Sequence, residues 1–254
     1  MNSNYDINNI FNFFEYWKNY TQPTEFYNEG WLLKLLVFSV TNYGLKDHIL
    51  FVNEKDNFFS EALLYSPFLA RTRRDSFAET HTHADGVIGN YTIGNDKSKG
   101  SLLLIGNKLN VFEAKIYSKF SKNVSNAPFY DQVSRYIACI TETIDKANKI
   151  ENLNELTIGF YLTIPKEKFQ NTMNYKKCLD KKHILKTVKE RVEQYKNDKD
   201  FNLRKEWFEK KFTPVLEKII IEPIFYETII TELQGCKYIN EIKSFYDSCL
   251  MYNK

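Results

Sequence analysis

Three short apolar runs bounded by glycines follow one another in the middle of the chain and limit the folds that it can adopt. They are GVIGNYTIG (86–94), SLLLIG (101–106) and KLNVFEAKIYS (108–118). Runs of this kind are typical of consecutive β-strands, and the polar stretch GNDKSKG predicts a turn between the first two. A helical pattern then begins at Pro128 and extends to about Lys149, and LTIGFYLTIP (156–165) predicts a further strand. Strands on both sides of a helix indicate an α/β core.

Helical patterns also occupy both ends of the chain. Apolar residues recur at three- and four-residue spacing over 5–20 and 26–41. After the last predicted strand the pattern is helical almost to the end, with breaks near 197–202, Pro223 and Gly235. We therefore expect helices to surround the strand-rich part of the chain.

The composition is that of a folded protein. The chain has 254 residues, of which 43% are hydrophobic, and this length is enough for one domain with a sizeable core. We predict a single domain over 1–254, with a core at about 50–165 and helical additions at 1–50 and 166–254. The long C-terminal helices make a homo-oligomer or a protein partner plausible.

The chain carries no sign of export or membrane insertion. Its first residues, MNSNYDINNIFNFFEYW, lack the basic start and continuous apolar core of a signal peptide. No apolar run approaches the roughly 20 residues that span a bilayer, so we expect a cytoplasmic protein with no membrane partner. The four cysteines form no C-x-x-C pair, and we expect reduced, mostly buried thiols rather than a zinc or iron–sulfur cluster.

Basic residues are clustered although the formal net charge is only +3. The segment KKCLDKKHILKTVKER (176–191) contains seven basic and two acidic side chains, and RTRR (71–74) and KIYSKFSK (115–122) add two smaller clusters. Clusters of this kind serve phosphate binding, or they form ordinary solvated helix faces. The side chains that we select as candidate nucleic-acid contacts are Arg71, Arg73, Arg74, Lys119, Lys122, Lys181 and Lys182.

The strand LNVFEAKIYS contains the residues that point to chemistry. Side chains two apart on a strand share a face, so Glu113 and Lys115 emerge together while Phe112 and Ala114 face the other way. A carboxylate and an ammonium on an apolar strand are costly to bury without a purpose. If the strand that begins at Asp85 pairs with this one, Asp85 and Glu113 can hold one Mg²⁺ or Mn²⁺ ion, because hard cations prefer oxygen ligands. Lys115 beside the ion can orient or deprotonate the attacking water.

Asp85 followed by Glu113-Ala114-Lys115 resembles the signature of the PD-(D/E)XK nuclease superfamily. The following helix contains Gln132 and Tyr136, a Gln-x-x-x-Tyr spacing that resembles RecB-type members. The resemblance covers about residues 58–165. It implies a restriction-endonuclease-like fold with a mixed central sheet flanked by helices. It also implies Mg²⁺ binding by Asp85, Glu113 and the backbone carbonyl of Ala114, water activation by Lys115, and a role for Gln132 beside the metal.

The resemblance adds two further expectations, about Tyr136 and Glu61. Tyr136 lies near the active site of such nucleases and is a candidate nucleic-acid contact. A helix before the signature often supplies another acidic ligand, and FFSEALLYS offers Glu61 for it. The sequence also departs from the family name, because Ala84 stands where the name has proline.

Each of these residues also has a simpler interpretation. Asp85-Gly86 is a common turn dipeptide, and Glu113 and Lys115 can form an ion pair on a solvated sheet face. Their order along the chain nevertheless favours a metal-dependent nuclease, a phosphodiester hydrolase that acts on DNA rather than RNA. One alternative is a catalytically silent nucleic-acid-binding or assembly module with the same fold.

The stretch ETHTHADG (79–86) supports a second alternative, a zinc hydrolase that uses His81 and His83. It resembles the His-x-His-x-Asp motif of metallo-β-lactamase-fold hydrolases, but Gly86 stands where that family has another histidine. Only His183 follows downstream, so the usual dinuclear ligand set is incomplete. We therefore expect the aspartate to be the metal ligand and the histidines to be loop residues beside it.

Overall fold

The computed structural model describes residues 7–70, 75–79, 81–94, 102–118 and 127–253. Its centre is a mixed five-stranded sheet in the order β1-β4-β5-β6-β7. The first three of these strands are antiparallel neighbours, whereas β6 is parallel to both β5 and β7. A separate antiparallel pair, β2 and β3, lies beside it. The strands are β1 (Asn57–Phe59), β2 (Ala62–Leu64), β3 (Thr82–Ala84), β4 (Gly86–Ile93), β5 (Leu102–Ala114), β6 (Thr157–Ile164) and β7 (Ile220–Phe225).

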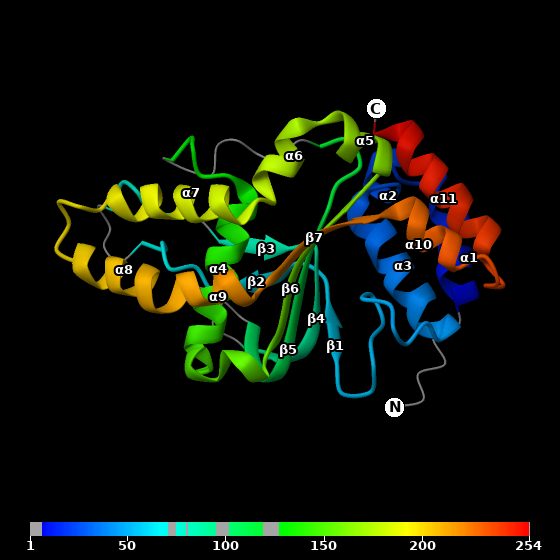
Figure 1. The fold of residues 1–254 in the computed structure, drawn as a ribbon. Helices are drawn as coiled ribbons and strands as arrows, with labels where there is room; N and C mark the ends of the chain where they lie inside the picture. Colours follow the sequence, from blue (N-terminus) through cyan, green and yellow to red (C-terminus); the bar gives the residue numbers. More distant parts are fainter. Residues whose placement is uncertain (1–6, 71–74, 80, 95–101, 119–126, 254) are drawn as a thin grey trace.

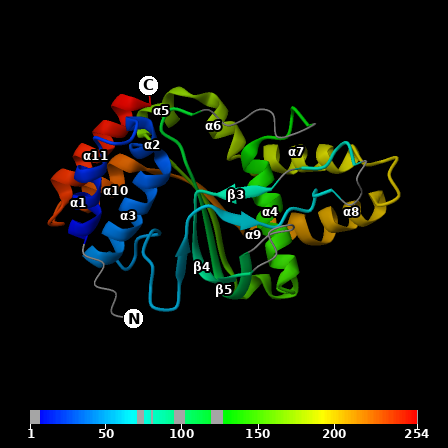
Figure 2. The ribbon, with the colours of Figure 1, turned by 180° about the vertical axis from the view of Figure 1, so that it is seen from behind.

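Helices cover both faces of the sheet (Figures 1 and 2). One group consists of α4 (Gln132–Lys146), α7 (Lys181–Glu193), α8 (Phe201–Trp207) and α9 (Thr213–Lys218). The opposite group consists of α1 (Ile7–Trp17), α2 (Pro23–Phe26), α3 (Glu29–Tyr43), α10 (Tyr226–Glu232) and α11 (Ile239–Tyr252). Two short helices, α5 (Lys166–Asn171) and α6 (Met173–Cys178), follow the carboxyl end of β6. Two irregular turns complete the helical part: a 3₁₀ segment at Ile150–Glu155 and a π-helical one at Phe208–Phe212.

The sheet separates two hydrophobic clusters, and β5 contributes to both. Leu109 and Val111 belong to the cluster that contains α4 and α7. Phe112 and Ala114 belong to the cluster that contains α3, α10 and α11. This alternation agrees with the period-2 pattern predicted for the strand, so Glu113 lies on the α4 face.

Several predicted elements are confirmed in altered form. The two runs predicted as separate strands at 101–106 and 108–118 form the single 13-residue strand β5. The helix expected from Pro128 begins at Gln132, because Asp131 caps it by accepting a hydrogen bond from the Ser134 amide. The strand predicted at 156–165 is β6. The turn predicted at 94–100 lies almost wholly outside the described residues.

Two predictions about the core are wrong. The segment around Glu61, expected to be helical, forms β1, a left-handed turn residue (φ 56°) and β2. The sheet also extends beyond the predicted core at 50–165, because β7 is its fifth strand. Pro223 is compatible with β7 because the strand lies at the edge of the sheet, where an amide need not be donated to a further neighbour.

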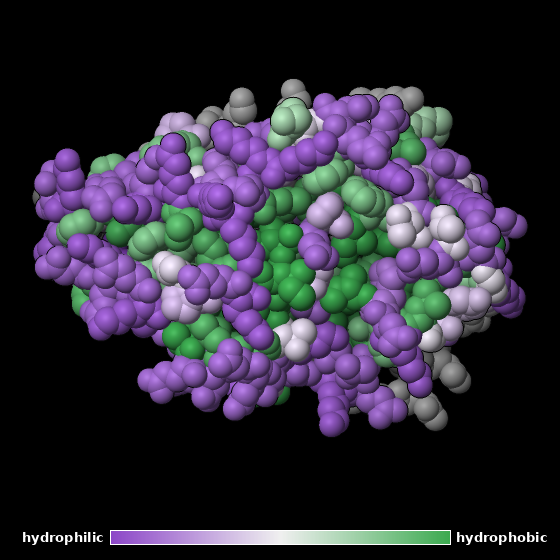
Figure 3. All heavy atoms as spheres, in the orientation of Figure 1, coloured by the Kyte–Doolittle hydropathy of each residue, from purple (hydrophilic) through white to green (hydrophobic). Residues whose placement is uncertain are grey.

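Hydrophobic residues reach the surface between the two groups of helices, over β6 and β7 (Figure 3). Hydrophilic residues dominate the surface of α7 and α8. Ile220 at the start of β7 is 44% exposed. Within the described part of the chain, no helix has the length and apolarity needed to cross a membrane.

Candidate active site

The end of β5 brings Asp85, Glu113 and Lys115 together. Gly86 pairs with Phe112 in the antiparallel register, so the next position places Asp85 opposite Glu113. The Asp85 carboxylate accepts a hydrogen bond of 2.7 Å from the amide of Ala114. Glu113 and Lys115 form an ion pair although their side chains are only 2% and 10% exposed. The spacing expected from the sequence therefore corresponds to a real cluster at the carboxyl end of the central strand β5.

Helix α4, which packs on the face of the sheet that carries Glu113, adds two side chains to this cluster. The side-chain amide of Gln132 donates a hydrogen bond of 2.6 Å to one carboxylate oxygen of Glu113. The Tyr136 hydroxyl lies within hydrogen-bonding distance of the other oxygen and 2.7 Å from the carbonyl of His83. Because residues four apart share a helix face, the Gln-x-x-x-Tyr spacing places both groups on Glu113. Tyr136 is only 2% exposed, so it holds Glu113 from within rather than offering the surface contact that we predicted.

The pKa values of Asp85 and Lys115 are both raised, but for different reasons. Burial, reinforced by the nearby charge of Glu113, raises the pKa of Asp85 to about 8, although the Ala114 amide and Lys115 act in the opposite direction. Burial alone would lower the pKa of Lys115, but the Glu113 carboxylate outweighs it and the pKa is raised. Asp85 is thus an acid in an environment that disfavours its charge, whereas Lys115 stays cationic. A divalent cation would relieve the repulsion between the two carboxylates.

The backbone of Ala114 is directed toward Asp85. In a β-strand the N–H and C=O of one residue point toward the same neighbouring strand. The Ala114 amide binds Asp85, whereas the amide of Lys115 donates to Thr163 of β6 at 2.8 Å. The carbonyl of Ala114 consequently faces the Asp85 side, where the resemblance implies a metal ligand.

Two further acidic residues influence the cluster from its rim. Glu61 contributes to the raised pKa of Asp85, but it is exposed on the turn between β1 and β2 rather than on a helix. Glu29, in the first turn of α3, contributes to the raised pKa of Lys115 and accepts a hydrogen bond of 2.9 Å from Ser118. Glu29 was not predicted from the sequence, because a glutamate in a helical first turn carries no chemical signal of its own.

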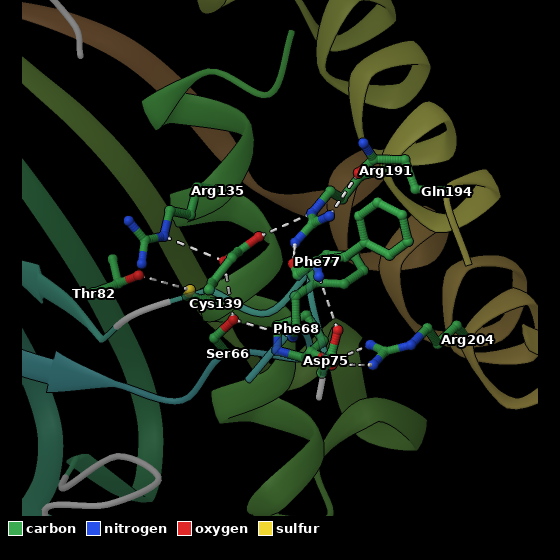
Figure 4. A network of polar contacts seen from close by, with 12 residues as sticks. Ser66, Phe68, Asp75, Phe77, Thr82, Arg135, Cys139, Arg191, Gln194 and Arg204 are labelled. Carbon is green, nitrogen blue, oxygen red and sulfur yellow. Dashed lines mark hydrogen bonds and ion pairs between the residues drawn. The ribbon is translucent and has the colours of Figure 1, made fainter. Parts of the chain in front are cut away.

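A buried charge network holds the chain at Glu79, just before strand β3 and Asp85. Glu79 has no exposed side-chain surface and lies 3.2 Å from Arg191 Nε of α7 and 3.3 Å from Arg135 Nε of α4. Figure 4 shows Arg135 and Arg191 on two sides of this network, with Ser66 below them. Ser66 donates a hydrogen bond of 3.2 Å to Glu79.

Helix α4 binds β3 directly as well. Arg135 donates to the carbonyl of His81 at 3.2 Å, Tyr136 contacts the carbonyl of His83, and Cys139 Sγ lies 3.5 Å from the Thr82 hydroxyl. Seen from behind, β3 lies across α4 (Figure 2). The helix that carries Gln132 thus also fixes the chain just before Asp85.

The histidines of the zinc-hydrolase alternative do not converge on one point. Both are exposed, and the His83 ring lies 3.2 Å from the carbonyl of Glu61. Among the described residues, one group of three side chains brings its ligand atoms within 4.8 Å of one another, and neither His81 nor His83 belongs to it. His81 precedes β3, but His83 lies within this strand rather than in the loop that we expected.

The candidate nucleic-acid contacts have mixed outcomes. The three arginines of 71–74, Lys119 and Lys122 lie outside the described residues. Lys182 is exposed on α7, whereas Lys181 donates to the carbonyl of Glu217 at 2.9 Å. Arg191, the last basic residue of the segment 176–191, is wholly buried against Glu79. That segment is therefore partly a solvated face and partly a structural one.

The four cysteines are free thiols, three of them buried, as expected. In comparisons with known proteins, no family model matches the chain, and neither a curated protein nor a solved structure matches it.

Proposed function

We propose that this protein is a metal-dependent nuclease with a restriction-endonuclease-like fold, and that it hydrolyses phosphodiester bonds, with DNA as the first substrate to test. The observation that carries the proposal is the contact of the Asp85 carboxylate with the amide between Glu113 and Lys115. It supports a site with two acidic side chains, a backbone carbonyl and an ammonium group at the carboxyl end of a central strand. The order of the elements, with α4 and its Gln132 between β5 and the parallel strand β6, adds support.

In the proposed site Asp85, Glu113 and the Ala114 carbonyl hold Mg²⁺ or Mn²⁺, since oxygen ligands suit these ions. The ion supplies Lewis-acid stabilisation of the charge that develops on the phosphate. Lys115 remains protonated, so it orients the attacking water and stabilises negative charge rather than acting as a base. Gln132 holds Glu113 in position. The exposed lysines of α7 next to α4 are candidates for binding the substrate backbone.

One observation favours the second candidate, a catalytically silent module. Both carboxylate oxygens of Glu113 already have donors from Gln132 and Tyr136, and Lys115 neutralises its charge. A fully satisfied ion pair of this kind can simply link β5 to α4. Under that function the chain binds nucleic acid or a protein partner without cleaving anything.

The decisive experiment is cleavage of supercoiled plasmid and single-stranded DNA by the purified protein in Mg²⁺ or Mn²⁺, with a chelator as control. We expect cleavage that the chelator abolishes. Asp85→Asn and Lys115→Met should each reduce the rate on the order of 100-fold or more, the loss typical when a group that stabilises the transition state is removed. DNA affinity should change little.

The matched control is Lys108→Met. Lys108 lies on β5, to which Lys115 is the next residue, and it also pairs with a carboxylate, that of Asp56 at 2.6 Å, but it is partly exposed and lies far along the strand from Asp85. It should cleave at the wild-type rate. Wild-type rates in both Asp85→Asn and Lys115→Met would refute the nuclease, and DNA binding without cleavage in either metal would establish the silent module.

A further inference from the structure

A second cluster of ligand-type side chains lies at the start of α4. Asp131 caps α4, Cys178 ends α6, and His183 lies in the first turn of α7. One ligand atom from each lies within 4.8 Å of the other two. These residues are far apart in the sequence, so the fold has to bring three elements together to form the group.

The separations are close to those around a small tetrahedral ion. His183 Nε2 lies 3.0 Å from an oxygen of Asp131, a hydrogen-bond distance that would widen slightly on binding a metal between the two atoms. Ligand atoms bound to one zinc ion at roughly 2.0–2.3 Å lie about 3.3–3.6 Å apart in tetrahedral geometry. A carboxylate oxygen, an imidazole nitrogen and a thiolate sulfur form a mixed set that selects Zn²⁺ or Co²⁺ over Mg²⁺.

Neighbouring groups already hold two of the three residues in place. The Ser134 amide and hydroxyl both donate to Asp131 at 3.0 Å, and Asp180 accepts the backbone amide of His183 at 2.9 Å. Such supporting hydrogen bonds orient ligands before a metal arrives. Cys178 is only 2% exposed, and its burial shields the thiol from solvent.

An adjoining pocket leaves room for a fourth ligand. It has a volume of about 480 Å³ and is lined by all three residues together with Asn174, Lys186 and Glu190. Three protein ligands and an open position are typical of zinc sites that retain a water molecule.

We propose that Asp131, Cys178 and His183 bind one Zn²⁺ ion, with water or a pocket side chain as the fourth ligand. The ion links the start of α4 to α6 and α7. This differs from the expectation that the cysteines take no part in a metal site. It is also separate from the Mg²⁺ or Mn²⁺ site proposed at Asp85 and does not depend on the nuclease function.

The test is Co²⁺ titration of the full-length protein after metal has been removed with a chelator. We expect one tightly bound Co²⁺ per chain, with a thiolate-to-cobalt charge-transfer band that added Zn²⁺ abolishes. Cys178→Ser should lose the band. Cys236→Ser, which removes another free cysteine, should keep it, and Asp85→Asn should keep it as well.

His183→Gln provides a second, independent readout, because it leaves the thiol in place. We expect its Co²⁺ affinity to fall at least about tenfold, the lower end of the loss expected when a metal site is disrupted, and circular dichroism should show wild-type helix content. Absence of the band in the wild-type protein would overturn the proposal. So would a band that survives in Cys178→Ser, or wild-type Co²⁺ affinity in folded His183→Gln.

Discussion

Asp85 and Glu113 are both acids at the end of β5, but their surroundings are different. Glu113 is paired with Lys115 and held by two donors from α4. Asp85 has one backbone donor and lies close enough to Glu113 to be affected by its charge. A bound cation would therefore stabilise the carboxylate of Asp85 more than that of Glu113. We expect the pH dependence of metal binding to come mainly from Asp85.

The raised pKa of Asp85 predicts how its contribution to stability varies with pH. The pKa is about 8 in the folded chain and 3.8 as the ordinary value, so folding takes up a proton between these limits. The contribution of Asp85 to the free energy of unfolding consequently falls as pH rises from about 4 to about 8. One proton sets a ceiling of about 1.4 kcal/mol per pH unit for the slope. The measured slope should stay below that ceiling, because the Asp85 side chain is partly exposed and solvent screens its charge.

Urea unfolding of the wild-type protein and Asp85→Asn in chelator, at several pH values between the ordinary and the raised pKa, measures this effect. Asparagine can still accept from the Ala114 amide but does not titrate. The stability of the variant relative to the wild type should increase with pH, and Mn²⁺ should reduce the difference at the upper end of the range. Parallel curves for the two proteins over this range would contradict the prediction.

At the scale of elements, α4 is the component on which the site depends. It supplies Gln132 and Tyr136 to Glu113, and its Arg135 joins Glu79 and Arg191 in the buried network. The network joins Glu79, which precedes β3 in the chain, to α4 and α7, so the chain before Asp85 and the helix beside it are positioned together. Removing one buried charge should loosen both.

Arg191→Met tests this coupling. It removes the buried partner of Glu79 and the contact of the guanidinium with Gln194, so we expect a loss of about 3–5 kcal/mol in the free energy of unfolding. Lys210→Met, which breaks the exposed pair with Glu206 on the surface, should change it by less than about 1 kcal/mol. Both variants are measured by urea unfolding. A loss in Arg191→Met as small as the one expected for Lys210→Met would show that the network adds no stability.

The strands of the core were predictable where they are apolar and bounded by breakers, as β4 and β6 are. Strand β7 was not, because Pro223 breaks the apolar pattern and only its edge position makes the proline acceptable. The helix at Glu61 was an error of the opposite kind, because it was implied by the family resemblance alone, whereas this stretch forms two short strands joined by a turn.

The site was predictable where it depends on short spacings. Glu113 and Lys115 share a face because they are two apart on a strand, and Gln132 and Tyr136 because they are four apart on a helix. The buried network around Glu79 was not recognised as a unit, and neither was the cluster around Asp131. Each of these groups comes from three separate elements, and only the packing of α4 against α6, α7 and the strands brings its members together.

At the scale of the whole molecule, the sheet needs both groups of helices. The cluster on one face draws on Leu33 of α3 and Phe245 of α11, and the cluster on the other face on Val188 of α7. All three lie outside the predicted core at 50–165. A chain limited to 50–165 would lose all the helices on one face of the sheet and keep only α4 of the group on the other face.

We therefore expect residues 50–165 expressed alone to lack a cooperative thermal transition, whereas the full chain should show one. Circular dichroism and calorimetry of the two proteins provide the measurement. A sharp unfolding transition in the shorter chain would mean that the helical additions are dispensable for folding, and that the predicted core is an independent unit after all.

The attachment of α4 to β3 has a consequence for how this chain can vary over evolution. Arg135 and Tyr136 reach the main-chain carbonyls of residues 81 and 83, so the attachment does not depend on which side chains stand there. In diverging descendants the two histidines should drift freely, whereas the arginine and the tyrosine should be retained. The most conspicuous letters of ETHTHADG would then be the ones under the weakest selection.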